Sequence, residues 1–308
     1  MVTEPQGKKE LCRDREIWAG LNRPEVSLES ADIVIFGVPY DGSVSFRAGA
    51  GEAPDAIRNI TRTISPTTED FKSFQHLKIK DLGNVEGCSR DEVFTRTTRL
   101  TRSCVKNNRF FIMLGGDHSV TIPVCKGIDT VVENPFGIVH IDAHFDLCDS
   151  LDQDRFSHGC TARRAMELDH VKGIEDIFFL GVRSIETDEL DFFNHHPVQV
   201  RSARDISRIG PVECAEQVKK QLAHLDMIYL TLDIDCLDPA YAAGTGTPQF
   251  GGLNSRELLT LLEQLFDLPI IGMDIVEVAP GLDPSLTSVF AARKIITEVF
   301  GFISKNQR

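Results

Sequence analysis

Three short segments of the 308-residue sequence concentrate histidines and aspartates at spacings that suit metal binding. The densest is Val139-His-Ile-Asp-Ala-His-Phe-Asp146, where polar residues alternate with apolar or small ones. This alternation is the period of one face of a β-strand. Two carboxylates and two imidazoles on one face would stay unpaired in a dry core, and a cation between them removes that penalty. The segment therefore predicts a metal site, with a fully hydrogen-bonded polar face as the alternative.

The other two segments also follow apolar runs. Leu230-Thr-Leu-Asp-Ile-Asp-Cys236 places Asp233 and Asp235 on one face, which is a second metal signature. Gly115-Gly-Asp-His118 adds a histidine, although on its own it reads as a turn capped by Asp117 with a structural histidine. Taken together, the segments offer six candidate ligands, which are His118, Asp142, His144, Asp146, Asp233 and Asp235.

Four carboxylates and two imidazoles exceed what one zinc ion takes in its usual tetrahedral site. With bridging carboxylates they suit two divalent ions about 3.5–4 Å apart, as in two-metal hydrolytic sites. Oxygen-rich His/Asp ligation favours manganese over zinc, with nickel and cobalt as alternatives. The sequence therefore predicts two Mn²⁺ per subunit.

Two further residues are candidates beside these ligands. Glu277 follows the apolar run Ile270–Val276 and either faces the same site or is an ion-paired surface glutamate. His158 lies in a loop only twelve residues beyond Asp146. The sequence contains no GxxxxGK[ST] phosphate loop, no complete dinucleotide fingerprint and no G-x-S-x-G elbow. The attacking group is therefore expected to come from the metals and not from a side chain.

The elements that position these residues are expected to alternate between strands and helices. Short apolar runs predict strands at Asp32–Val38, Leu77–Lys80, Arg109–Leu114, Gly137–Ile141, Ile177–Val182, Val198–Val200, Ile228–Leu232 and Ile270–Val276. Helix-like stretches between them are Ala53–Thr61, Arg90–Asn107, Ser119–Val132, Glu186–His195, Val212–Leu225 and Ser255–Leu265. This order favours an α/β fold with a mainly parallel, eight-stranded sheet. Ligands gather at the carboxyl ends of such strands, where the three segments lie.

The charge balance limits the partners. Lysine and arginine number 33 against 46 aspartates and glutamates, which gives a net charge of −13. This balance argues against nucleic acid and anionic membranes, because both need a basic face. No apolar run approaches the roughly 18–20 residues of a membrane span. The amino terminus also lacks the apolar region of a secretory signal.

Cysteine usage and the absence of linkers complete the outline. The eight cysteines are scattered without a CxxC pair, so we expect reduced thiols in a cytoplasmic protein. No low-complexity segment, linker or repeat interrupts residues 30–300. We therefore expect one domain over residues 1–308, with residues 1–30 as an amino-terminal extension or arm.

These motifs make the chain resemble the ureohydrolase family, which comprises the arginases and agmatinases. GGDHSV at 115–120, DAHFD at 142–146 and the segment Leu232–Pro239 match its three signature segments. The match continues through Gly244–Gly252 and Asp274–Pro280 and covers about residues 30–300. The resemblance implies a three-layer α/β/α fold, the arginase-like fold, with a binuclear manganese centre. It also implies a homo-oligomer, either a trimer or a hexamer.

The resemblance further implies a role for each site residue. Two aspartates would bridge the ions, one ion being held by His118, Asp142, Asp146 and Asp233 and the other by Asp142, His144, Asp233 and Asp235. Glu277 would bind a small cationic guanidino substrate. Asp146 would pass a proton to the leaving amine, and His158 would shuttle protons to solvent. The products would be urea and an amine.

The agmatinase branch is the favoured one, because Gly244–Gly252 and 47–58 resemble it and the loop before His158 lacks an arginase-type pattern. The second segment departs from that branch at four positions, Ala48, Gly51, Glu52 and Ala53.

The loop before His158 bears on the substrate's tail. Its acidic residues, among them Asp154, favour a cationic tail such as that of agmatine, which would yield putrescine and urea. If Arg155 points inward, 4-guanidinobutyrate or 3-guanidinopropionate would fit, and a small pocket would take guanidine. Arginase activity, a one-zinc deacetylase and a non-catalytic relative are weaker alternatives, the last because every expected site residue is present.

Overall fold

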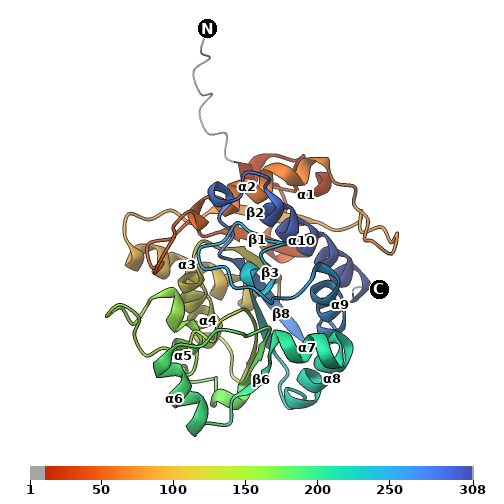
Figure 1. The fold of residues 1–308 in the computed structure, drawn as a ribbon. Helices are drawn as coiled ribbons and strands as arrows, with labels where there is room; N and C mark the ends of the chain where they lie inside the picture. Colours follow the sequence, from red (N-terminus) through yellow and green to blue (C-terminus); the bar gives the residue numbers. More distant parts are fainter. Residues whose placement is uncertain (1–10, 307–308) are drawn as a thin grey trace.

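The computed structural model describes residues 11–306, and one eight-stranded sheet forms its centre (Figure 1). The strands are β1 (Ile33–Gly37), β2 (Ile79–Asn84), β3 (Phe110–Leu114), β4 (Gly137–Ile141), β5 (Ile177–Leu180), β6 (Gln199–Arg201), β7 (Ile228–Asp233) and β8 (Ile270–Val276). Their order is β2-β1-β3-β8-β7-β4-β5-β6, and every pairing between them is parallel. The sheet is therefore wholly parallel, where the sequence predicted a mainly parallel one.

The helices that follow β1 in the chain divide between the two faces of the sheet. One face carries α3 (Arg90–Lys106), α4 (Thr121–Asp129), α5 (Thr161–Ala165) and α6 (Thr187–His195), on the left of Figure 1. The other carries α2 (Ala53–Ile60), α7 (Ala203–Ile209), α8 (Pro211–Gln221), α9 (Ser255–Leu265) and α10 (Thr287–Asn306). Within residues 11–306, no helix is both long and apolar enough to cross a bilayer.

Each face of the sheet has its own hydrophobic core. Along β1, Ile33 and Ile35 belong to the core beneath α2 and α10, whereas Val34 and Phe36 belong to the core beneath α3 and α4. Both faces are buried, which explains why the strands read as continuous apolar runs and not as alternating ones. The two cores confirm the predicted three-layer α/β/α fold.

Helix α10 is the longest element that the sequence analysis did not predict. Its buried side chains recur every three or four residues, which is the pattern of an amphipathic helix. They include Val289, Ala292, Ile296, Val299 and Ile303. The signal was therefore present in the sequence. The short helices α1 (Ile17–Gly20), α5 and α7 were also not predicted.

The predicted amino-terminal extension lies only partly within the described residues, since residues 1–10 are outside them. The remainder packs against the edge of the sheet. Trp18 is fully buried, and its Nε1–H donates to Asp81 Oδ2 on β2 at 2.8 Å. The guanidinium of Arg58 donates to both oxygens of Asp81, at 2.8 and 2.9 Å. This buried ion pair ties the segment before β1 to α2 and β2.

Candidate metal centre

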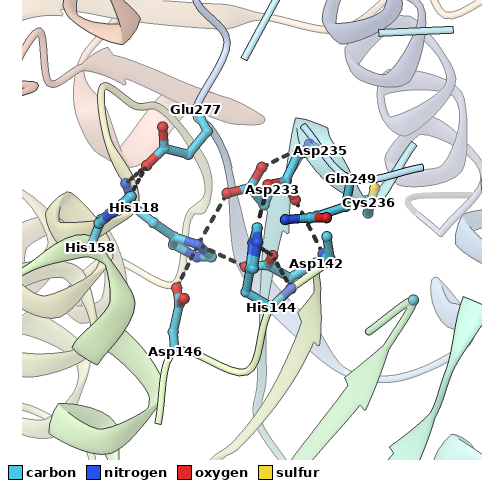
Figure 2. Close-up of polar contacts among 12 residues, drawn as sticks. His118, Asp142, His144, Asp146, His158, Asp233, Asp235, Cys236, Gln249 and Glu277 are labelled. Atoms are coloured by element: carbon cyan, nitrogen blue, oxygen red, sulfur yellow. Dashed lines mark hydrogen bonds and ion pairs between the residues drawn. The ribbon is translucent and has the colours of Figure 1, made fainter. Parts of the chain in front are cut away.

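The six predicted ligands lie at the carboxyl ends of three central strands, and Glu277 lies at the end of a fourth. Strands β3, β8, β7 and β4 are neighbours in the sheet, and because they are parallel their carboxyl ends share one edge. His118 follows β3, and residues 142–146 follow β4. Asp233 is the last residue of β7, Asp235 comes two residues later, and Glu277 follows β8. Figure 2 shows these side chains pointing toward one another. The fold thus brings all six predicted ligands and Glu277 into one cluster.

Loops, and not strand faces, carry most of these ligands. Strand β4 ends at Ile141, so His140 is the only one of the four alternating polar residues that lies on the strand. The expectation that residues 140–146 share one strand face is wrong, because the chain leaves the sheet there and Asp146 adopts a left-handed conformation (φ 54°). Asp235 likewise lies in a 3₁₀ turn beyond β7. The alternation singled out residues that the fold does bring together, but it does so through loops and not through one strand face.

The carboxylate oxygens and imidazole nitrogens that could bind metal form two groups, called donor groups, and both include Asp142. In the first, His118 Nδ1 lies 3.0 Å from Asp142 Oδ2, 3.0 Å from Asp146 Oδ2 and 3.4 Å from Asp233 Oδ2. In the second, His144 Nδ1 lies 3.4 Å from Asp142 Oδ1 and 3.2 Å from Asp235 Oδ2. One oxygen of Asp142 therefore faces each group. This is the arrangement expected of a carboxylate that bridges two ions.

Several donor atoms of these groups have no partner. His118 Nδ1, Asp146 Oδ2 and Asp235 Oδ2 are buried, and none has a hydrogen-bond partner within residues 11–306. Buried polar atoms in this state are costly. A divalent cation in each group would satisfy these atoms together. The donor set therefore fits two metal ions that share Asp142.

The proton affinities of the cluster reflect its excess of negative charge. Burial raises the pKa of Asp233 well above its ordinary value, and the neighbouring carboxylates of Asp235 and Asp142 add to this. Burial disfavours a charged imidazole at His144, yet the carboxylates of Asp235 and Asp142 raise its pKa to about 12. The crowding of carboxylates thus raises the pKa of both a carboxyl group and an imidazole of the cluster.

His140 is a buried neighbour that the predicted ligand set did not include. Its Nε2 lies 3.0 Å from Asp142 Oδ2. Its ring stacks on that of His118, with centroids 4.9 Å apart and planes 15° from parallel. His140 therefore contacts both a bridging carboxylate and a ligand ring from the strand side of the cluster.

Glu277 and His158 form a polar pair beside the two groups. Glu277 is buried, which rules out the surface-glutamate alternative. Its Oε1 accepts the backbone N–H of His118 at 2.9 Å and lies 2.9 Å from His158 Nδ1. His158 Nε2 lies 2.9 Å from the hydroxyl of Ser45. Burial opposes a charged His158, but the carboxylate of Glu277 raises its pKa to about 9.

A cavity opens onto both groups. Four of the candidate ligands (His118, His144, Asp146 and Asp233) and His158 face it. The rest of its lining within the described chain is Ser45, Cys148, Leu151, Gly159, Ser184, Glu186, Glu189, Thr247 and Gln249.

Asp154 and Arg155, the predicted readers of the substrate's tail, do not line this cavity. Asp154 forms an ion pair with Arg90. The guanidinium of Arg155 donates to Glu167 at 2.7 Å and is 55 % exposed. These side chains find partners on other surface elements, so the loop acids and Arg155 are not brought to the site.

Glu186 and Glu189 line the cavity instead, and the sequence analysis did not single them out. They lie at the start of α6, just after the carboxyl end of β5, which neighbours β4. Glu189 accepts the backbone N–H groups of Leu147 (2.7 Å) and Glu186 (2.9 Å). Burial raises its pKa to about 7. Their position next to a central strand end was the available signal.

Comparison with known proteins agrees with this geometry. Residues 31–301 match the model of a family described as the Arginase family. The chain belongs to the arginase family. Proclavaminate amidinohydrolase of Streptomyces clavuligerus is 33 % identical, over 84 % of each chain. Its solved structure aligns with a TM-score of 0.83 at 30 % identity, covering 92 % of this chain and 94 % of that one. Agmatinase of Neisseria meningitidis serogroup A is 34 % identical over 87 % of this chain and 86 % of its own.

Family membership confirms the resemblance drawn from the signature segments, including the agmatinase-like branch. It also confirms the expected class, a hydrolase of C–N bonds in linear amidines, at the level of the family. All six candidate ligands lie within residues 31–301, the segment that matches the family.

The unpartnered donors predict that divalent metal stabilises the protein. At free Mn²⁺ 100-fold above the dissociation constant, each occupied site adds about 2.7 kcal/mol to the free energy of unfolding. Chelator-treated protein should therefore show a rise in Tm when Mn²⁺ is added. Asp142→Asn should abolish the rise, whereas Asp149→Asn, an exposed acid of the same loop, should keep it. An unchanged Tm in the unmodified protein would contradict the metal assignment.

Proposed function

We propose that this protein is a binuclear-metal amidinohydrolase that cleaves a guanidino compound to urea and an amine. The cofactor proposed is two Mn²⁺ per subunit, with Ni²⁺ or Co²⁺ as alternatives, and the substrate proposed is agmatine, which yields putrescine. The observation that carries the proposal is the pair of donor groups sharing Asp142, with the buried carboxylate of Glu277 beside them. A cationic, planar substrate and a metal-assisted hydrolysis both follow from that combination.

Each group of residues is proposed to have a different role in hydrolysis. The six ligands His118, Asp142, His144, Asp146, Asp233 and Asp235 would hold two divalent ions, which would make water available as a nucleophile at about pH 7. Glu277 would bind the guanidinium by charge-assisted hydrogen bonds and hold its carbon beside the donor groups. The Asp146 carboxylate faces the cavity from the first group and would carry the proton released by the water to the departing amine.

His158 is placed to exchange protons with solvent. Its Nδ1 contacts the buried carboxylate of Glu277, and its Nε2 contacts Ser45, which is exposed and lines the cavity. The ring therefore lies between Glu277, which would bind the substrate, and an exposed residue of the cavity. A histidine in this position can deliver protons to the amine product.

The cavity charge supports a substrate with a cationic tail. Glu186 and Glu189 contribute carboxyl groups, and the lining within residues 11–306 includes no lysine or arginine. Arg183 lies nearby, but its guanidinium donates to the backbone carbonyls of Asp235 (2.7 Å) and Gln249 (2.8 Å). A carboxylate tail, as in 4-guanidinobutyrate, would meet repulsion here. Agmatine, whose far end is an amine, would not.

Oligomerisation and location remain predictions from the sequence. The family resemblance leads us to propose a trimer or hexamer, and the cysteine usage a cytoplasmic location.

The substrate proposal predicts a ranking of urea release. Mn²⁺-loaded protein should turn over agmatine faster than arginine, 4-guanidinobutyrate, 3-guanidinopropionate or guanidine. Glu186→Gln should raise KM for agmatine by about 10–150-fold, because a charge-assisted hydrogen bond contributes about 1.5–3 kcal/mol. KM for guanidine, which has no tail, should not change. Glu167→Gln, which removes an acid outside the cavity, is the control. Preference for a guanidino acid would contradict the assignment of the tail.

The proton role predicts a separation between turnover and metal content. His158→Ala should lower kcat by about 10²–10⁴-fold, the usual contribution of a general acid–base group, with both metals retained. Asp142→Asn should lose metal and activity together. His170→Ala serves as a control, because His170 pairs with Asp129 outside the site. Loss of metal from His158→Ala, measured by elemental analysis, would assign this histidine a structural role instead.

A further inference from the structure

A buried carboxylate lies within the sheet beneath the donor groups. Asp274 of β8 is fully buried and accepts four hydrogen bonds. Its Oδ2 accepts from the hydroxyls of Thr121 (2.7 Å) and Tyr229 (2.6 Å). Its Oδ1 accepts from the hydroxyl of Thr231 (2.7 Å) and the backbone N–H of Leu232 (3.2 Å). None of these four donors is a cation, so neutral hydroxyls and one backbone N–H satisfy this buried carboxyl group.

The strand register places Asp274 in a polar row that leads to the donor groups. His140 of β4 pairs with Thr231 of β7, and Thr231 pairs with Asp274 of β8. Neighbouring positions in a parallel sheet present their side chains on the same face. His140 contacts Asp142 at 3.0 Å, and Thr231 Oγ1 lies 2.8 Å from His118 Nε2. The row therefore contacts one ligand from each of two strand ends.

The direction of the Thr231 hydrogen bond determines which ring nitrogen of His118 carries the proton. A threonine hydroxyl has a single proton to donate. Thr231 donates that proton to Asp274 Oδ1, so toward His118 its oxygen can only accept. Nε2 of His118 must then carry the ring proton. This leaves a lone pair on Nδ1, the atom that lies 3.0 Å from the carboxylates of Asp142 and Asp146.

We propose that Thr231 and Asp274 are positioning residues that orient His118 and hold it in the tautomer that binds metal. The proposal rests on the metal centre of the proposed function. Loss of an outer-shell hydrogen bond to a ligating histidine typically weakens metal binding by about 10–100-fold. His144 belongs to the other group and lies at the cavity, with 24 % of its side chain exposed. The two ions should therefore respond differently when Thr231 is changed.

Calorimetric titration of the metal-free protein with Mn²⁺ tests this. The unmodified protein should bind two ions. Thr231→Val keeps the side-chain shape but removes the hydroxyl, so one ion should bind as before and the other about 10–100-fold more weakly. Thr231→Ser, which restores the hydroxyl, should restore both affinities. If the Thr231→Val variant does not fold, Thr231→Ala replaces it, and the same weakening of one ion is expected.

Thr121→Val is the matched control, because the Thr121 hydroxyl donates to the same carboxylate and not to the His118 ring, while the backbone N–H that contacts the His118 carbonyl is kept. It should leave both affinities unchanged. Two tight ions in the Thr231→Val and Thr231→Ala variants would overturn the inference. Equal weakening in Thr121→Val, or no recovery in Thr231→Ser, would also overturn it. Fewer than two ions in the unmodified protein would instead refute the metal centre itself, so the two failures are distinguishable.

Discussion

The site depends on one constraint, the meeting of unpaired acceptor atoms around Asp142. Carboxylates from two strand ends and the ring nitrogens of His118 and His144 face one another across 3.0–3.4 Å. Such a cluster is costly in a buried setting unless cations occupy it. A wholly parallel sheet supplies the necessary geometry, because the carboxyl ends of β3, β8, β7 and β4 lie side by side at one edge.

The chemistry was readable from the sequence because its residues lie in short segments at strand ends. The order of the strands in the sheet could not be predicted from the sequence. The prediction of the ligands did not need that order, because it assumed only that the carboxyl ends of these strands lie close together. The structure does not place Asp154 and Arg155 at the cavity, and the reason is physical. Asp154 and Arg155 pair with Arg90 and Glu167, and partner choice among exposed charges depends on surfaces that only the folded chain defines. Helix α10 was missed although its apolar spacing was present.

The residues proposed for catalysis and those proposed to contact the substrate's tail belong to different parts of the scaffold. The donor groups and Glu277 extend from the central strands, whereas Glu186 and Glu189 belong to the connection from β5 to α6. Arg183 links the two parts, because its guanidinium donates to the carbonyl of Asp235 beside the ligands and to that of Gln249 on the cavity wall. Changes in these connections can alter the tail that is accepted while the donor groups stay in place.

Electron paramagnetic resonance of protein loaded with two equivalents of Mn²⁺ tests the shared site most directly. Because one oxygen of Asp142 faces each donor group, the two ions should lie about 3.5–4 Å apart, as in other two-metal sites. The spectrum should be that of an exchange-coupled pair. A spectrum of isolated, uncoupled Mn²⁺ at saturation would contradict a binuclear centre bridged by Asp142.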